Sequence, residues 1–87
     1  MKNYLDPEFI RKQTEDLVCW EEFPPTVAYL KTHIRIAETA IEYSYSLWDA
    51  GTMSGVQMIE IHKELIKYKD LLNVILTARS HTQCQKA

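Results

Sequence analysis

Residues 27–48, VAYLKTHIRIAETAIEYSYSLW, carry the pattern that decides the fold. Apolar or small side chains recur along this stretch at alternating spacings of three and four residues, which is typical of a helix that packs along a neighbouring helix. The members of this apolar stripe are Val27, Leu30, Ile34, Ala37, Ile41, Ser44 and Trp48. Thr26 is a suitable N-cap and Gly51 suits the left-handed conformation that ends a helix, so we predict a helix over residues 27–50.

A second row of side chains follows the same spacing, one strip further around this helix. Its members are Tyr29, His33, Ile36, Ala40, Tyr43 and Leu47. The stripe and the row together cover more than half of the circumference, whereas a helix with one neighbour needs an apolar face only about 100° wide. We therefore expect the helix to contact two neighbours, or one neighbour and a partner chain.

Another long helix is predicted after the turn DAGTMSG at residues 49–55. Ser54 and Gln57 have the spacing of a capping box. Apolar side chains then recur at helical spacing, which predicts a helix over residues 55–79 and a polar tail over residues 80–87. Its stripe consists of Met58, Ile61, Leu65, Tyr68, Leu72 and Ile75, widened on one side by Ile59, Ile66 and Leu76 and on the other by Leu71, Val74 and Ala78. Because the turn is short, the two long helices should lie side by side and antiparallel.

A shorter helix is predicted over residues 7–22, ahead of the two prolines at 24–25. Asp6 is a suitable N-cap, and Pro7 fits the first helical position. The expected fold is therefore all-α, with a long antiparallel helical hairpin and a shorter N-terminal helix in a three-helix, bundle-like arrangement. One short helix leaves part of the hairpin uncovered, so we expect self-association or a partner protein to complete the bundle.

Length and composition narrow the class of protein. The 87 residues leave room for one domain, over residues 1–87, and the net charge of −2 with scattered lysine and arginine argues against nucleic-acid binding. The start MKNYLDPEF lacks the apolar segment of a signal peptide, and no apolar run approaches the ~20 residues of a membrane span. We therefore expect a cytoplasmic protein that does not enter a membrane. Cys19 and Cys84 fit no metal spacing and are expected to be free thiols there, with a disulfide between them as the open alternative.

The heptapeptide IEIHKEL, residues 59–65, sets two carboxylates around an imidazole. In a helix, Glu60 and Glu64 share a face, whereas His62 lies about 200° around the axis from each. Helical carboxylate–histidine ligand pairs need Glu-x-x-His spacing, which neither glutamate has with respect to His62. We therefore predict no metal or cofactor site here.

The remaining histidine of the hairpin is His33. In an antiparallel hairpin that turns near residue 51, His33 lies opposite residue 70 and His62 lies opposite residue 41. The two histidines are then about 12 Å apart along the axis, too far to share a ligand. We expect a hydrogen bond between His33 and Asp70.

No catalytic residue is predicted, and one resemblance bears on this point. Residues 50–72, AGTMSGVQMIEIHKELIKYKDLL, loosely resemble the turn and second helix of the small sporulation-type aspartyl-phosphate phosphatases, which are antiparallel helical hairpins. That family's motif reads Ser-Gln-Glu-Leu-Asp, and the corresponding run here, from His62 to Ile66, keeps only Glu64 and Leu65. The resemblance implies a small hairpin phosphatase-like enzyme as an alternative function.

Four residues of the second row, which we call the tyrosine row, are Tyr29, Ile36, Tyr43 and Leu47. Tyrosine tolerates half-exposed positions and is enriched at protein interfaces. Two arrangements are open: the row receives the first helix, or it is exposed and binds a partner. We predict these four residues as the partner-binding site.

The patterns together favour a small non-enzymatic interaction module. It would be a regulator or inhibitor that binds a larger protein through apolar and aromatic helix faces, with no small-molecule substrate. A structural homo-oligomeric helical bundle, which buries the same surface against further copies of the chain, is the first alternative.

Overall fold

The computed structural model describes the backbone of residues 2–18 and 26–86 and the side chains of residues 4–18 and 26–78. It contains a short 3-10 helix, η1 (Lys2–Leu5), and three α-helices, α1 (Pro7–Val18), α2 (Val27–Asp49) and α3 (Gly55–Lys86). No strand occurs in these ranges. The all-α fold predicted from the sequence is confirmed.

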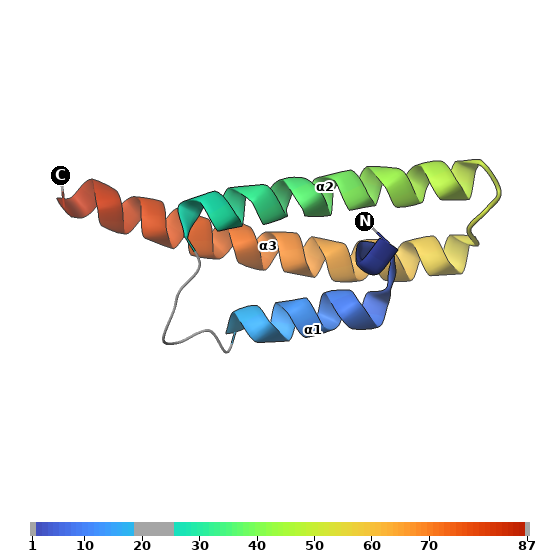
Figure 1. Ribbon diagram of the computed structural model, residues 1–87, viewed down its shortest axis with the longest axis horizontal. Coiled ribbons are helices and arrows are strands. Elements are labelled where there is room, and N and C mark those ends of the chain that lie inside the picture. The colour runs from blue at the N-terminus through green and yellow to red at the C-terminus, as the bar shows by residue number, and fades with distance from the viewer. Residues whose placement is uncertain (1, 19–25, 87) are drawn as a thin grey trace.

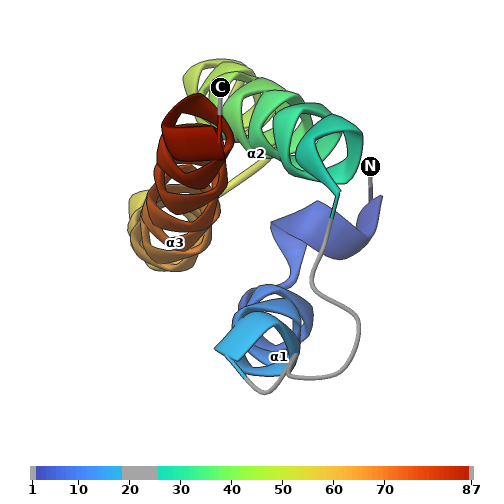
Figure 2. The ribbon, with the colours of Figure 1, turned by 90° about the vertical axis from the view of Figure 1, so that its left-hand side faces the viewer.

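The two long helices, α2 and α3, lie side by side and antiparallel (Figure 1). The shorter α1 packs on α3, and η1 lies between α1 and α2 (Figure 2). The result is a hairpin with a shorter N-terminal helix against one of its two members, as expected. The molecule is elongated, with principal extents of 51 × 22 × 16 Å.

The ends of the hairpin helices follow the predicted signals. The Thr26 side chain accepts a hydrogen bond from the Tyr29 backbone N–H at 3.1 Å, which caps α2. Gly51 has a φ of +81°, a conformation that glycine adopts without strain. The Gln57 N–H donates to the Ser54 hydroxyl at 3.1 Å while the Ser54 N–H donates to the Gln57 side chain at 3.2 Å, so the capping box is present.

The observed elements depart from the sequence prediction at the two ends of the chain. The helix η1 was not predicted, and the expected end of α1 near residue 22 lies outside the described residues. At the other end, α3 continues to Lys86, so the prediction of a polar tail over 80–87 is wrong as far as Lys86. The physical reason is that no glycine or proline follows Gly55, and polar residues such as Gln, Lys and Arg are good helix formers. The loss of apolar periodicity near residue 79 does not mark the end of the helix.

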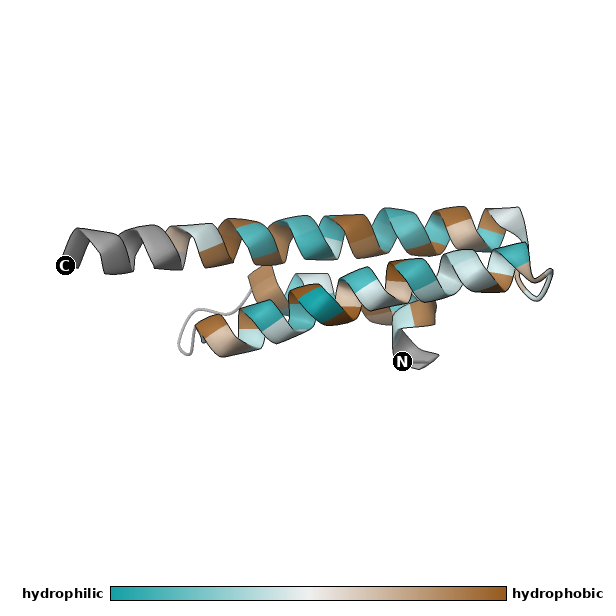
Figure 3. Cartoon of the chain, turned by 90° about the horizontal axis from the view of Figure 1, so that it is seen from above, coloured by the Kyte–Doolittle hydropathy of each residue, from teal (hydrophilic) through white to brown (hydrophobic). Residues whose placement is uncertain are grey.

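The described core follows the predicted stripes, except that on α2 a residue of the second row is buried and a residue of the main stripe is exposed. Its buried apolar members are Ile10 and Leu17 of α1, Leu30, Ala37 and Ala40 of α2, and Ile61, Leu65, Tyr68 and Leu72 of α3. On α2, Ala40 of the second row is buried, whereas Trp48 of the main stripe is 41% exposed. Hydrophobic and hydrophilic residues accordingly alternate in bands along α2 and α3 (Figure 3). Because Ala40 of the second row is buried and α2 contacts η1, the buried face of α2 is turned partly towards η1.

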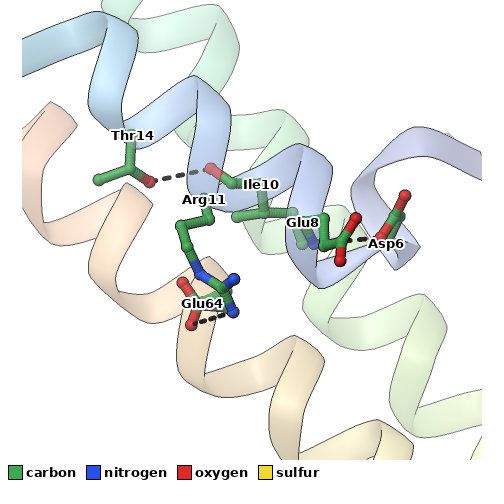
Figure 4. A network of polar contacts seen from close by, with 6 residues as sticks. All are labelled: Asp6, Glu8, Ile10, Arg11, Thr14 and Glu64. Carbon is green, nitrogen blue, oxygen red and sulfur yellow. Dashed lines mark hydrogen bonds and ion pairs between the residues drawn. The ribbon is translucent and has the colours of Figure 1, made fainter.

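An ion pair ties α1 to α3 at the side of this core (Figure 4). Arg11 lies 3.5 Å from Glu64, and the Glu64 side chain is 11% exposed while that of Arg11 is 57% exposed. Burying a carboxylate costs desolvation free energy that a cationic partner helps to offset. The ion pair therefore favours the observed position of α1 on α3. The start of α1 is capped by Asp6, which accepts a hydrogen bond from the Glu8 N–H at 3.1 Å.

Leu65 is fully buried at the centre of α3, so its truncation should leave a cavity. We expect Leu65→Ala to lower the free energy of unfolding by about 3 kcal/mol, measured by urea denaturation followed by circular dichroism. Val74→Ala is the control, because Val74 is exposed on the same helix and its truncation should change stability by no more than ~0.5 kcal/mol. Equal effects of the two substitutions would contradict the described core.

Candidate interaction surfaces

The tyrosine row is divided by the tertiary structure. Tyr29 packs against the buried core, whereas Tyr43 is 47% exposed. Ile36 and Leu47 are half-buried and do not belong to the core cluster or to the residues packed on it. The first helix lies on α3 and not on this face of α2, so the arrangement in which the row receives α1 is not the one found. Three of the four residues thus remain at the surface of α2.

Tyr29 is part of an aromatic cluster where η1, α2 and α3 meet. Its ring stacks on His33 with centroids 4.0 Å apart, and the Tyr68 hydroxyl lies 2.9 Å from Nδ1 of His33. Tyr4 of η1 reaches the same nitrogen at 3.4 Å, and its ring meets Phe9 edge-on at 5.3 Å. The cluster supplies partners for polar groups that the packing of three elements buries.

Ionisation in this cluster is suppressed by burial. Burial lowers the pKa of His33 below its ordinary value. Burial, with the neighbouring hydroxyls of Tyr4 and Tyr29, raises the pKa of Tyr68 far above the usual tyrosine range. Tyr68 is therefore a neutral hydroxyl near neutral pH, and it can donate to Nδ1 of a neutral His33. The expected hydrogen bond from His33 to Asp70 is wrong, because the true partner, Tyr68, lies two residues nearer the start of α3.

His62 contacts a buried serine of α2. Its Nε2 lies 2.7 Å from the Ser44 hydroxyl and 3.2 Å from the Ile41 carbonyl oxygen. The contact with Ile41 matches the register expected for His62. A carbonyl can only accept, and the Ser44 hydroxyl donates its own proton to that same carbonyl at 2.8 Å. In the tautomer with the proton on Nε2, His62 donates to both oxygens and is not a base towards Ser44. Ser44 is also fully buried, out of reach of a substrate.

The two carboxylates beside His62 point elsewhere, as the helical spacing predicts. Glu64 faces α1 and pairs with Arg11. Glu60 is exposed, and His62 faces α2. The three side chains do not converge. Among the described residues, no group of three or more His, Cys, Asp or Glu side chains is placed to hold a metal ion.

A second group of exposed apolar side chains comes from both α2 and α3, and we call it the hairpin patch. It consists of Tyr45, Trp48, Ile59 and Ile66 around His62, and the four apolar members are 41 to 62% exposed. The Tyr45 ring meets Trp48 edge-on at 5.4 Å and stacks over His62 at 6.2 Å. Ile59 and Ile66 stand three residues before and four residues after His62, so they flank it on the same face of α3.

Sequence reasoning missed this patch. The seven-residue spacing of Ile59 and Ile66 was a signal of an apolar face on α3. From the sequence alone, these two residues instead belong to the edge of the stripe that forms the core. Tyr45 belongs to no row of α2 that the sequence singled out. Only the register of α2 against α3 brings Tyr45 and Trp48 beside these isoleucines.

Cys19 and the side chain of Cys84, predicted to be free thiols, lie outside the described residues. Within the described part of the chain, none of the helices combines the length and the apolar character that crossing a membrane requires.

Comparison with known proteins gives no functional lead. Neither the protein-family models, nor the curated proteins, nor the solved structures contain a significant match to this chain. The candidate surfaces are therefore interpreted from their own geometry.

The buried position of His33 predicts a pH dependence of stability. Its pKa is lowered in the folded chain, so the unfolded chain binds more protons once the pH falls to about 6.5 and below. The contribution of His33 to stability is present above the unfolded pKa and is lost as the pH falls towards the folded pKa. We expect the urea midpoint to decrease between about pH 7.5 and pH 5 and this decrease to be shallower in His33→Gln. Identical slopes in the two proteins would contradict this assignment.

Proposed function

We propose that this chain is a non-enzymatic protein-interaction module, a cytoplasmic regulator or inhibitor that binds a larger protein through the tyrosine row of α2. Tyr43 is the centre of the proposed contact, with Ile36 and Leu47 beside it on the same helix face. Tyr29 forms the inner boundary of the contact, since it is packed against the core. The observation that carries the proposal is the exposure of Tyr43, which lies between two apolar neighbours that the core does not use.

The position of α1 supports a partner on this face. α1 and α3 pack against one another, and the described parts of α1 and α2 have no direct backbone contact, because η1 lies between them. One side of α2 is therefore bordered by η1, and α1 does not cover α2 (Figure 2). An amphipathic element of a partner could lie along it.

The phosphatase alternative has less support from the contacts of Glu64. This is the acidic residue that the chain shares with the phosphatase motif, and it is nearly buried and paired with Arg11. His62, on another face of α3, lies 2.7 Å from the Ser44 hydroxyl and 3.2 Å from the Ile41 carbonyl oxygen, an arrangement suited to holding α3 on α2. Both side chains thus have packing roles that leave them little freedom for catalysis.

Tyr43→Glu tests the proposed contact. The substitution places a charge at the centre of the tyrosine row but changes an exposed residue, so the helical content should stay the same. We expect the proteins captured by the tagged chain from a lysate of the source cells to be lost with Tyr43→Glu. In a solution titration against the main captured protein, its affinity should fall at least about tenfold.

Tyr45→Glu is the matched control. Tyr45 is exposed on the same helix, 54% against 47% for Tyr43, but it points about 200° away around the axis. We expect this variant to keep the captured proteins and the affinity of the main one in solution. A partner that binds Tyr43→Glu as tightly as the unsubstituted chain would refute the docking surface.

A further inference from the structure

The hairpin patch lies on the side of α2 opposite to Tyr43 and has no occupant in the proposed function. Tyr45 and Tyr43 are two residues apart, which places them about 200° apart around the helix. The patch is an apolar centre of four side chains, with the His62 imidazole between them. Clustered exposed residues of this kind mark binding surfaces more often than scattered ones do.

On each of the two helices, one basic and one acidic side chain stand near the patch at the same spacing along the chain. Arg35 and Glu42 stand seven residues apart on α2, and Lys63 and Asp70 stand seven residues apart on α3. All four side chains are exposed. The two ion pairs found among the described residues, Arg11–Glu64 and Lys69–Glu38, use none of them.

Three of these charges border the patch on its outer sides. Glu42 is three residues before Tyr45 and therefore next to it on the face of α2. Lys63 lies between Ile59 and Ile66 at spacings of four and three residues, which makes it a direct neighbour of both. Asp70 is four residues after Ile66 and is also next to the patch, whereas Arg35 stands about 15 Å from Tyr45 along α2.

The register of the hairpin sets the heights of these charges. Lys69 lies 3.7 Å from Glu38, and His62 lies 2.7 Å from Ser44. In this antiparallel register Lys63 is level with Glu42 and Asp70 is level with Arg35, to within about two residues or ~3 Å along the axis. Opposite charges at the two edges therefore share the same height.

We propose that two copies of the chain form a symmetric dimer through the hairpin patch. The two-fold axis runs along the hairpin, with both turns at the same end, so that α2 of one copy lies antiparallel to α3 of the other. Glu42 then faces the partner's Lys63 and Arg35 faces the partner's Asp70, and symmetry makes each pair twice. Tyr45, Trp48, Ile59 and Ile66 meet their counterparts inside a four-helix arrangement of both hairpins, with α1 outside.

A second copy is the occupant because the charges on α2 of one copy are opposite in sign to those on α3 of the other. They also match in height along the axis and in spacing. A partner of a different sequence would require that match by coincidence.

Charge reversal tests the predicted pairs. We expect E42K and K63E, each alone, to weaken the dimer about tenfold, because each variant puts like charges together at two places. In an equimolar mixture, the mixed dimer joins opposite charges at both α2–α3 contacts, so its affinity should return to that of the unsubstituted chain. Sedimentation equilibrium over a hundredfold dilution measures all three, and circular dichroism checks the fold of the exposed-site variants.

Two tyrosine substitutions locate the interface. Y45E should weaken the dimer by more than about thirtyfold, whereas Y43E should leave its affinity unchanged. A chain that is monomeric over the whole dilution series would overturn the proposal. So would a dimer that Y43E disrupts and Y45E does not, or one whose affinity the E42K and K63E mixture fails to restore. Because Y43E tests the partner contact and Y45E the dimer, either proposal can fail while the other survives.

Discussion

The packing of α3 against α2 is the contact on which the rest of the structure depends. Ile61, Leu65, Tyr68 and Leu72 of α3 are all buried, and they recur at the three- and four-residue spacing that keeps one face towards a neighbour. The short α1 packs on α3 and is joined to it by the pair of Arg11 and Glu64. Without the hairpin, α1 would have no surface to cover.

Two polar contacts inside the hairpin fix the position of α3 along α2. Tyr68 meets His33 near one end of the contact, and His62 meets Ser44 and the Ile41 carbonyl near the other. Apolar side chains alone tolerate shifts between equivalent positions, whereas a buried hydrogen-bonding group that loses its partner costs about 1–3 kcal/mol. The register in turn decides which exposed residues of α2 and α3 become neighbours.

The two surfaces proposed for binding arise from the same helix. Tyr43 and Tyr45 are similar in chemistry and in exposure, but the helical rotation between them places them on different faces of α2, with Tyr45 stacked over His62 of α3. One face can then hold a partner while the other holds a second copy of the chain. Both faces contribute to an apolar surface on α2 that is wider than a single neighbour requires.

The sequence by itself determined the three helices, the antiparallel hairpin, the capping residues and most of the core, because these depend on local spacing and on a few turn residues. It also determined that Glu60, His62 and Glu64 diverge, since that follows from helical rotation alone. Only the tertiary structure decided that α1 lies on α3, that Tyr29 joins a cluster with Tyr4, His33 and Tyr68, and that Tyr45 and Trp48 stand beside Ile59 and Ile66. These outcomes join residues far apart in the chain, and helical periodicity says which way each side chain points but not which helix lies there to meet it.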